Sequence, residues 1–191
     1  MTMASHINNV SRTITFHLRN ISRIRRFIDK ETCHHAVRSL ILSRLDYCNG
    51  LLSSLPKMHT LRLQRLQNWA ARLIFTVDRR HESAPLLKSL HWLPVTQRIS
   101  FKLLLYVYKS LNGLAPMYLS NCLKVYVPNR HLRSSKDHLR LQYPRTRVQA
   151  GDRTFTVCAS KLWNGLPLRI RQSASVNAFK KALKTFLFPY N

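Results

Sequence analysis

The apolar positions of the chain recur at intervals of three and four residues, which is the spacing of amphipathic α-helices. This pattern predicts one helix over residues 7–28, a second over 30–52 and a third over 56–75. Asp29 stands immediately before the second helix, where its carboxylate can accept hydrogen bonds from the first backbone N–H groups. The sequence therefore predicts a mainly α fold class.

The segment Leu90–Pro116 is predicted to be the core helix of the protein. On a helical wheel its basic residues Arg98, Lys102 and Lys109 fall on one narrow stripe, and apolar residues cover most of the remainder. A helix that is apolar on nearly all sides has to be surrounded by other elements. Its apolar run 103–108 is flanked by lysines and is too short to cross a bilayer. We therefore expect a core helix inside a protein whose outer faces are basic.

The second half of the chain predicts shorter elements. Short helices are expected from Ser83 and over 116–125, and residues 153–163 favour a strand followed by a helix. Residues 126–152 show little periodicity and many arginines, which indicates an extended basic loop with room for short strands.

The length of the chain allows one large domain or two small ones. The charged stretch after the third helix is the expected hinge, which predicts domains over 1–78 and 79–191. A last helix is predicted over 176–188 with Ser175 as its cap, and its apolar face can dock on the core or lie on a membrane surface. We favour docking, because an apolar core already exists for this helix to cover.

The charge of the chain is its most unusual property. Its 191 residues include 32 lysines and arginines but only 7 aspartates and glutamates, which gives a formal net charge of +25. Such an excess causes self-repulsion unless a polyanion binds. Nucleic acid is the first candidate for that polyanion, and an anionic membrane surface is the second.

Basic side chains are predicted to gather on three surfaces suited to a phosphate backbone. These are the face of the first helix opposite its apolar stripe, a row at i, i+3 and i+7 on the third helix, and the basic loop with the residue after it. The candidate nucleic-acid-binding residues are Arg12, Arg19, Arg23 and Arg26 on the first surface, Arg65, Asn68 and Arg72 on the second, and Arg130, Arg133, Arg145, Arg147 and Arg153 on the third. The alternative for each surface is an ordinary solvated polar face.

Two arginines fall among apolar positions. Arg25 lies on the apolar side of the first helix, and nothing in the sequence explains it. Arg44 lies inside the stripe of the second helix that is expected to be buried, which consists of Cys33, Val37, Leu40, Ile41, Leu45 and Cys48. Because a buried charge needs a partner, we expect Arg44 to meet a carbonyl or carboxylate of another segment rather than nucleic acid.

No catalytic or metal chemistry is expected from the sequence. Two-metal catalysis needs clustered carboxylates, and the seven acids are scattered along the chain. The four glycines form no phosphate-binding loop. The one set of thiols and imidazoles that could suggest zinc fits no structural-zinc spacing, and consists of Cys122, His131, His138 and Cys158. We therefore expect neither a metal nor a cofactor, and no enzyme activity of this chain alone.

The cysteines favour a reduced, intracellular setting. Cys33 and Cys48 lie on one predicted helix about 22 Å apart, which is too far for a disulfide. The N-terminus shows no long apolar run typical of a signal peptide. The adjacent His34 and His35 are expected to be an inert surface pair.

Several segments, in order along nearly the whole chain, resemble one family. They include SRLDYCNGLLSSLP (Ser43–Pro56), LQRLQNWAARLI (Leu63–Ile74), LKSLHWLPVTQRISFKLLLYVYKSLNGLAPMYLS (Leu87–Ser120), LRSS (Leu132–Ser135), KLWNGLPLRIR (Lys161–Arg171) and FKKALKTFLF (Phe179–Phe188). Together they resemble the C-terminal end of the reverse transcriptase polyprotein of non-LTR (LINE-type) retrotransposons of the jockey-like group. The chain departs from the usual family pattern at Trp69, Ala150 and Ser160.

The resemblance implies a thumb-like helical bundle followed by a second helical C-terminal domain with an extended basic loop over 126–152. The catalytic palm of the RNA-directed DNA polymerase, with its Tyr/Phe-x-Asp-Asp motif, would lie upstream. The expected function is nucleic-acid binding by a remnant of a LINE reverse transcriptase, with RNA or an RNA–DNA duplex as partner, target DNA as a further partner and no membrane. The expected location is intracellular, and nuclear if the protein functions. The alternative is a decayed retrotransposon open reading frame with no selected function.

Overall fold

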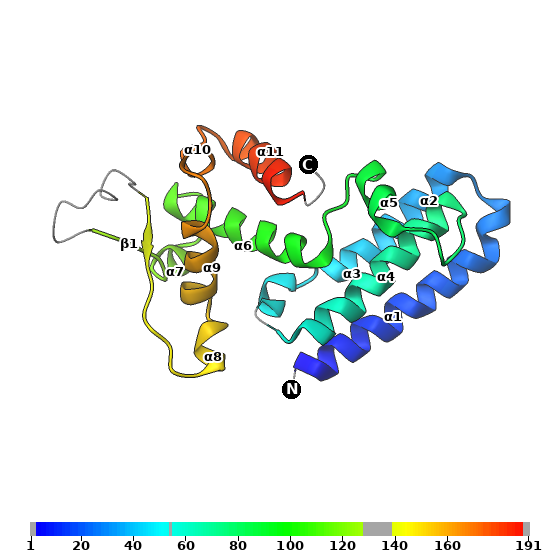
Figure 1. Ribbon diagram of the computed structural model, residues 1–191, viewed down its shortest axis with the longest axis horizontal. Helices are drawn as coiled ribbons and strands as arrows, with labels where there is room; N and C mark the ends of the chain where they lie inside the picture. Colours follow the sequence, from blue (N-terminus) through cyan, green and yellow to red (C-terminus); the bar gives the residue numbers. More distant parts are fainter. Residues whose placement is uncertain (1–2, 54, 128–138, 189–191) are drawn as a thin grey trace. The chain divides into compact units, whose positions relative to one another are not determined.

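The computed structural model describes residues 3–53, 55–127 and 139–188, and the described chain is mainly helical, as predicted (Figure 1). The first part comprises α1 (Met3–Ile24), η1 (Arg25–Phe27), α2 (Lys30–Val37), η2 (Arg38–Leu42), α3 (Ser43–Asp46), η3 (Asn49–Leu52), α4 (Lys57–Phe75) and α5 (Ser83–Ser89). It is followed by α6 (Val95–Leu111), α7 (Met117–Ser120), β1 (Lys124–Val125), β2 (Leu141–Gln142), α8 (Gln149–Asp152), α9 (Phe155–Asn164), α10 (Leu168–Arg171) and α11 (Val176–Leu187).

The chain divides into two compact units between Ile99 and Ser100, inside α6. This division falls later in the chain than the boundary predicted at 78/79, because α5 packs on α4 and belongs to the first unit. The segment after α5 belongs there too, since the ring of Trp92 stacks on His34 of α2 with 5.9 Å between the ring centroids.

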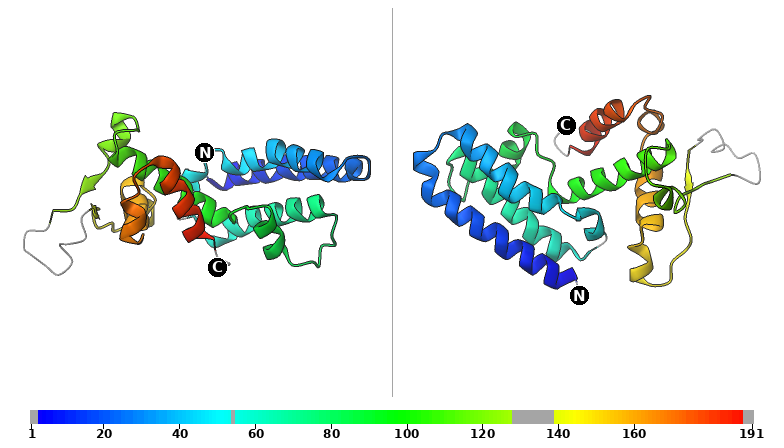
Figure 2. Two further views of the ribbon diagram at one scale, coloured as in Figure 1. Left: turned by 90° about the horizontal axis from the view of Figure 1, so that it is seen from above. Right: turned by 180° about the vertical axis from the view of Figure 1, so that it is seen from behind.

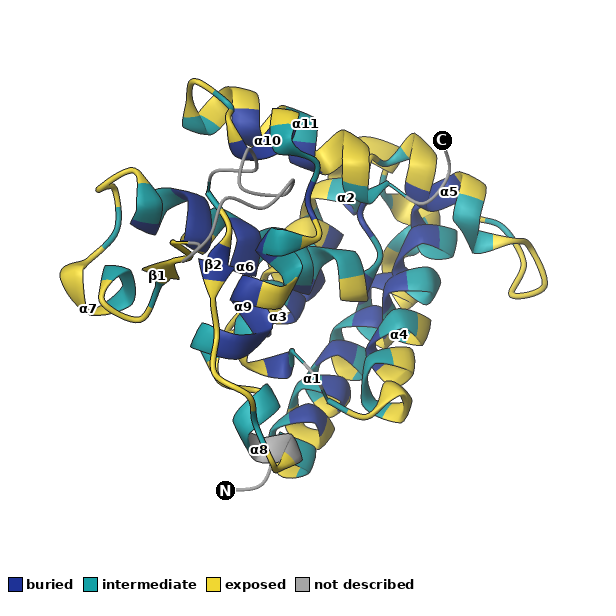
Figure 3. Ribbon diagram, turned by 60° about the vertical axis from the view of Figure 1, so that its left-hand side comes forward, coloured by how far each residue is buried: buried dark blue, intermediate teal, exposed yellow. Residues whose placement is uncertain are grey.

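Three long helical segments form the first unit. The helix α1, the continuous run from α2 through α3, and α4 lie side by side (Figure 2). Figure 3 shows buried positions along the length of α1 and α4. The core is built from the predicted apolar faces, including Ile14, Leu18, Val37, Leu63 and Ile74. Asp29 caps α2 as predicted, because its carboxylate accepts hydrogen bonds from the backbone N–H groups of Glu31 and Thr32.

Arg25, unexplained by the sequence, closes the C-terminal end of α4. Its Nε donates to the carbonyl of Leu73 over 3.0 Å, and its terminal nitrogens donate to the carbonyls of Ile74 at 3.0 Å and Ile28 at 2.8 Å. The last carbonyls of a helix have no partner within the helix, and a cation there also interacts favourably with the helix dipole. The inward position of Arg25 therefore ties η1 to the end of α4.

The second helical run contains a π-helical turn, η2, which changes part of the predicted buried stripe. Cys33, Val37, Ile41 and Leu45 are buried as predicted, and Leu42 is buried in addition. A π-turn adds a residue to one turn of the helix, so every later side chain moves around the axis.

The prediction is therefore wrong for the later stripe positions Leu40, Arg44 and Cys48, which are exposed. The predicted helix also ends earlier than residue 52, at Asp46, because Cys48 adopts a left-handed backbone conformation.

Asp46 forms an ion pair with Arg98 of α6. The Nε of Arg98 donates to Oδ1 of Asp46 over 2.8 Å, and a terminal nitrogen of the same guanidinium donates to Oδ2. This two-point pair joins α3 to the first turns of α6 within the first unit. Arg98 is thus half-buried and paired rather than part of a free basic stripe on α6.

The second unit packs α9 and α11 around the later part of α6. The ring of Phe179 stacks on Tyr108 with 4.2 Å between centroids and lies against Trp163. Phe179 and Leu183 are fully buried, so α11 docks by its apolar face, as favoured by the sequence. Ser175 caps this helix, since its Oγ accepts from the N–H of Ala178.

The only strands in the described residues are β1 and β2, which pair antiparallel with Val125 opposite Leu141. The predicted strand at the start of 153–163 is wrong, because this segment is a turn followed by α9. Asn164 of α9 holds β2 in place, as its amide exchanges two 2.8 Å hydrogen bonds with the backbone of Leu141. The indole of Trp163 donates to the carbonyl of Leu139.

Two further properties concern the described residues. None of their helices is both long and apolar enough to cross a membrane. All four cysteines fall within the described ranges, and none of them forms a disulfide there.

Replacing Arg25 with Met is expected to lower the free energy of unfolding by about 2–4 kcal/mol, because three hydrogen bonds from a charged donor to carbonyls are lost. Urea denaturation measures the change. The matched control is Arg26→Met, which removes the neighbouring exposed arginine and should cost less than about 0.5 kcal/mol. Equal losses for the two variants would contradict the capping role of Arg25.

The stability of the first unit is expected to fall on mild acidification through His34. Burial against Trp92, followed by the charges of His35 and Arg38, lowers the pKa of His34 below its ordinary value. The unfolded imidazole therefore binds a proton first, so stability is full above about pH 6.5 and decreases as the pH falls through the folded pKa.

Denaturation from about pH 7 to about pH 5 measures this dependence, which lies in the range where histidine titrates. His34→Gln should lose less stability than the wild type over this range, whereas the exposed control His81→Gln should behave like the wild type. A wild-type pH dependence in His34→Gln would disprove the assignment.

Candidate nucleic-acid interface

The outer face of α1 carries an exposed row of arginines. Arg12, Arg19 and Arg23 are exposed and form no hydrogen bond or ion pair with any residue that the structure describes. They lie on the side of the helix away from the buried Ile14 and Leu18. The structure therefore brings these three predicted residues together on one helix face that is open to solvent.

Two exposed aromatic rings, one on α1 and one in η1, accompany this row along the chain and were missed in the sequence. Phe16 is 60% exposed and lies one turn after Arg12, and Phe27 in η1 is 73% exposed. The guanidinium of Arg26 lies 4.7 Å from the centroid of the Phe27 ring. The spacing of Phe16 and Phe27 at whole helical turns from Arg12 and Arg23 was the signal that could have revealed them. Basic residues interleaved with exposed rings are typical of surfaces that contact nucleic-acid backbones and bases.

The predicted row on α4 is not one open basic face. Arg65 is exposed, but Asn68 and Arg72 are half-buried. The Nε of Arg72 donates to the carbonyl of His81 over 2.9 Å, and Oδ1 of Asn68 accepts from Nε2 of Gln64 over 2.7 Å. Of the three, Arg65 is thus the one whose side chain is available to a partner.

Gln64 and the buried Gln67 bind the backbone that precedes α6, which is why this side of α4 is not an open surface. Oε1 of Gln64 accepts from the N–H of Val95 over 2.8 Å, and Nε2 of Gln67 donates to the carbonyl of Leu93 over 2.9 Å. The two glutamines also bond to each other at 3.0 Å. The two glutamines thus hold the backbone of the segment that leads into α6, so this polar row has a structural role in the first unit.

The predicted residues of the second unit are only partly described. Arg145, Arg147 and Arg153 are exposed, whereas Arg130 and Arg133 lie outside the described residues, as do His131 and His138. The loop predicted over 126–152 is not wholly irregular, because β2 and α8 lie within it.

Asp152 anchors the end of this loop to α9. Its carboxylate accepts hydrogen bonds from Lys161 Nζ and Thr146 Oγ1, each at 2.7 Å. The hydrogen bond from Lys161 is the main cause that holds the pKa of Asp152 below its usual value, and the same bond raises the pKa of Lys161. Lys161 is thereby paired with Asp152. Arg145 and Arg147 in the same region are exposed.

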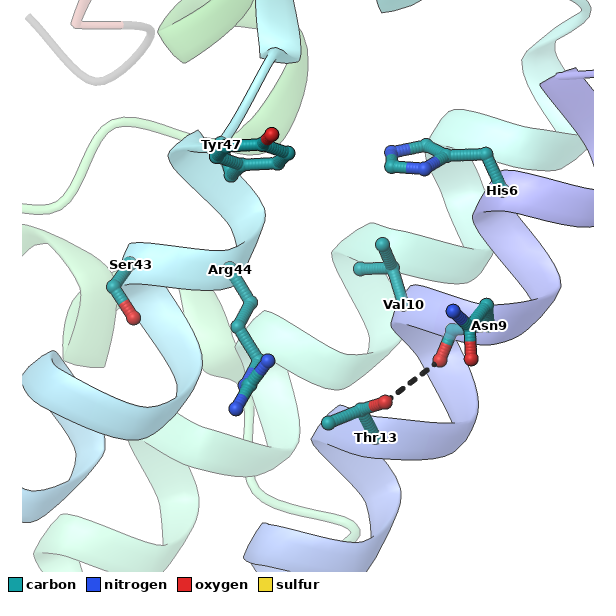
Figure 4. A pocket seen from close by; sticks show the side chains of 7 residues that line it. All are labelled: His6, Asn9, Val10, Thr13, Ser43, Arg44 and Tyr47. Carbon is teal, nitrogen blue, oxygen red and sulfur yellow. Dashed lines mark hydrogen bonds between the residues drawn. The ribbon is translucent and has the colours of Figure 1, made fainter.

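An open cleft of about 550 Å³ lies between α1 and α3 in the first unit (Figure 4). The residue pattern does not indicate this cleft, because the π-turn that precedes its α3 residues is not visible in that pattern. Figure 4 shows the rings of His6 and Tyr47 on opposite sides of the opening, with Arg44 further along the cleft. The side chains that line it are His6, Asn9, Val10, Thr13, Ser43, Arg44 and Tyr47.

Arg44 supplies the positive charge of this cleft. Its observed position differs from the one predicted from the sequence. It was expected to be buried with a carbonyl or carboxylate partner, but it is exposed and has no hydrogen bond or ion pair among the described residues. After η2, Leu45 lies in the core as predicted, whereas Arg44 turns outward.

Among the described residues, no group of three or more histidine, cysteine, aspartate or glutamate side chains could hold a metal ion. Comparisons of the chain with protein-family models, with curated proteins and with solved structures found no match.

Replacing Gln64 with Ala is expected to destabilise the first unit by about 1–3 kcal/mol, because the N–H of Val95 loses its partner in a half-buried position. The control Arg65→Ala removes the adjacent exposed side chain and should change stability by less than about 0.5 kcal/mol. Thermal unfolding compares the two variants. If Gln64→Ala is as stable as Arg65→Ala, the polar row of α4 has no structural role.

Proposed function

We propose that the chain binds nucleic acid, and that the exposed face of α1 makes the principal contact with the phosphate backbone. The observation that carries this proposal is the row of Arg12, Arg19 and Arg23, which is exposed and has no partner among the described residues. Three guanidiniums on one helix face create a strong positive potential, and no carboxylate of the described residues pairs with them.

The rings beside this row favour nucleic acid over other polyanions. Phe16 and Phe27 expose aromatic surface next to Arg12, Arg23 and Arg26. Aromatic faces add stacking to the electrostatic attraction, and unpaired bases offer the matching surface. Attachment to an anionic membrane through α11 is less favoured, because Phe179 and Leu183, which would have to enter the membrane, fill the core of the second unit.

The resemblance to LINE-type reverse transcriptases suggests which nucleic acid this is. We propose that the chain corresponds to the thumb and C-terminal region of such an enzyme and contacts RNA or an RNA–DNA duplex, with target DNA as a further partner. Catalysis is proposed for no residue of this chain, since its few carboxylates are dispersed. The helical character of the first unit supports this proposal, because a thumb is expected to be helical.

The alternative is an open reading frame that has decayed and has no selected role. Under this alternative, the fold is inherited from the ancestral element, and binding of nucleic acid has no function in the cell. Detection of the transcript and the protein in the source cells, together with the sequence upstream of Met1, separates the two cases.

The triple variant Arg12→Ala/Arg19→Ala/Arg23→Ala is expected to bind an RNA–DNA duplex much more weakly and with less dependence on salt. Each lost arginine–phosphate contact removes a released counterion, so the slope of log K against log salt should decrease by about 2–3 units in total. A salt titration of binding by fluorescence anisotropy measures both slopes.

The matched control removes three positive charges from α11 by the changes Lys180→Ala, Lys181→Ala and Lys184→Ala, all at exposed positions. Because charges beyond about 8 Å from the phosphates are largely screened at physiological salt, its slope should change by less than about one unit. Absence of binding by the wild type at low salt, or equal slopes for the two triple variants, would contradict the proposed role of α1.

A further inference from the structure

We infer that the cleft between α1 and α3 binds one unpaired nucleotide of a single-stranded nucleic acid, with its phosphate on Arg44 and its base between Tyr47 and His6. This inference deepens the proposed function and rests on it for the source of the nucleotide. The cleft lies on a different face of α1 from the arginine row. On an ideal helix, His6 and Thr13 lie about 120° around the axis from Arg19.

The size and lining of the cleft suit a nucleotide. Its volume of about 550 Å³ falls within the range of small-ligand sites, which is about 300–1,000 Å³. No aspartate or glutamate is among its lining residues, so nothing described there repels an anion. Its floor is apolar, because Val10 lies over the buried Ile7, Leu45 and Leu63.

Arg44 is the group that recognises the phosphate. A guanidinium presents several N–H donors in one plane, which match the oxygens of a phosphate. The neighbouring hydroxyls already use their protons inside the protein, since Thr13 Oγ1 donates to the carbonyl of Asn9 and Ser43 Oγ donates to the carbonyl of Ser39. Besides the ring N–H of His6 and the hydroxyl of Tyr47, the donors left for an anion are therefore the guanidinium of Arg44 and the side-chain amide of Asn9.

Tyr47 and His6 recognise the base. The two rings lie on opposite sides of the opening of the cleft (Figure 4), and Tyr47 is 69% exposed. Neither ring stacks on another ring among the described residues. Exposed aromatic rings that flank an arginine are the arrangement by which proteins hold bases that have left a stack. Since a base in a duplex is not available to such rings, the ligand is an unpaired nucleotide.

The test measures binding of the full chain to a fluorescein-labelled single-stranded RNA of about ten nucleotides, a length within the range of known single-strand sites. Arg44→Ala and Tyr47→Ala should each weaken binding about tenfold, whereas Tyr47→Phe keeps the ring and should stay within about twofold of wild type.

The matched controls are Arg38→Ala, an exposed arginine earlier in the same helical run, and Tyr118→Ala, whose side chain is 70% exposed in the second unit. Both should bind within about twofold of wild type. Thermal unfolding checks that every variant is folded. If Arg44→Ala and Tyr47→Ala bind the strand like their controls, the inference is overturned.

A second arm uses adenosine monophosphate alone and follows the nuclear magnetic resonance signals of the His6 and Tyr47 rings. Shifts caused by the monophosphate, and much weaker shifts caused by adenosine, support the cleft. If the monophosphate saturates the cleft only at a concentration far above the one at which the RNA strand saturates it, the ligand is a nucleotide within a strand. If the monophosphate and the strand bind with equal affinity, the ligand is a free nucleotide. No shift with either the monophosphate or the strand overturns the inference.

The two arms separate this inference from the proposed function. If the α1 triple variant weakens strand binding but the cleft variants do not, the cleft inference fails and the function of α1 stands. If the wild type binds neither strand nor duplex but the monophosphate shifts His6 and Tyr47, the proposed function fails and the cleft remains a nucleotide site.

Discussion

Guanidinium groups that turn inward in this fold are held mainly by backbone carbonyls, because the chain has few carboxylates to hold them. Arg25 donates to three carbonyls at the end of α4, and the buried Arg171 donates to the carbonyl of Leu166. Arg98 is the exception and takes Asp46. A carbonyl satisfies the hydrogen bonds of an arginine but leaves its charge uncompensated. The fold can therefore enclose several arginines and still present a large net positive charge.

This constraint separates structural arginines from available ones. The structural ones tie segments together, since Arg25 joins η1 to α4 and Arg98 joins α3 to α6. The available ones, Arg12, Arg19 and Arg23, remain on the outer face of α1, where they are exposed and form no hydrogen bond or ion pair with a described residue. An arginine's position in the sequence does not reveal to which class it belongs, because a carbonyl acceptor can come from any segment.

The helical pattern of the sequence was sufficient to predict the mainly α fold and the buried faces of α1 and α11, because each of these two helices keeps one regular period. It failed after Val37, where a π-turn breaks the period and moves Arg44 from the expected interior to the surface. It also failed on α4, where Asn68 has the polarity of a surface residue but bonds to Gln64. Such roles depend on segments far away in the sequence, and no local pattern encodes them.

The candidate site was accordingly predicted in part. The arginines of α1 could be placed from their wheel positions, whereas the cleft between α1 and α3 could not, because the same π-turn precedes its α3 residues. Figure 4 shows its residues coming from two helices whose contact the residue spacing does not reveal. The resemblance to a reverse transcriptase adds a class of partner, and the open face of α1 provides the physical reason to expect that partner there.

Contact between the α1 arginines and phosphate is tested most directly by the Nε–H resonances of the arginines in the isotope-labelled chain, recorded while an RNA–DNA duplex is added at low ionic strength. If α1 is the phosphate-binding face, the signals of Arg12, Arg19 and Arg23 shift or broaden first, and those of the carbonyl-bound Arg25 and the Asp46-bound Arg98 stay in place. Shifts confined to arginines outside α1, or no shift at all with the duplex in excess, would contradict the central claim.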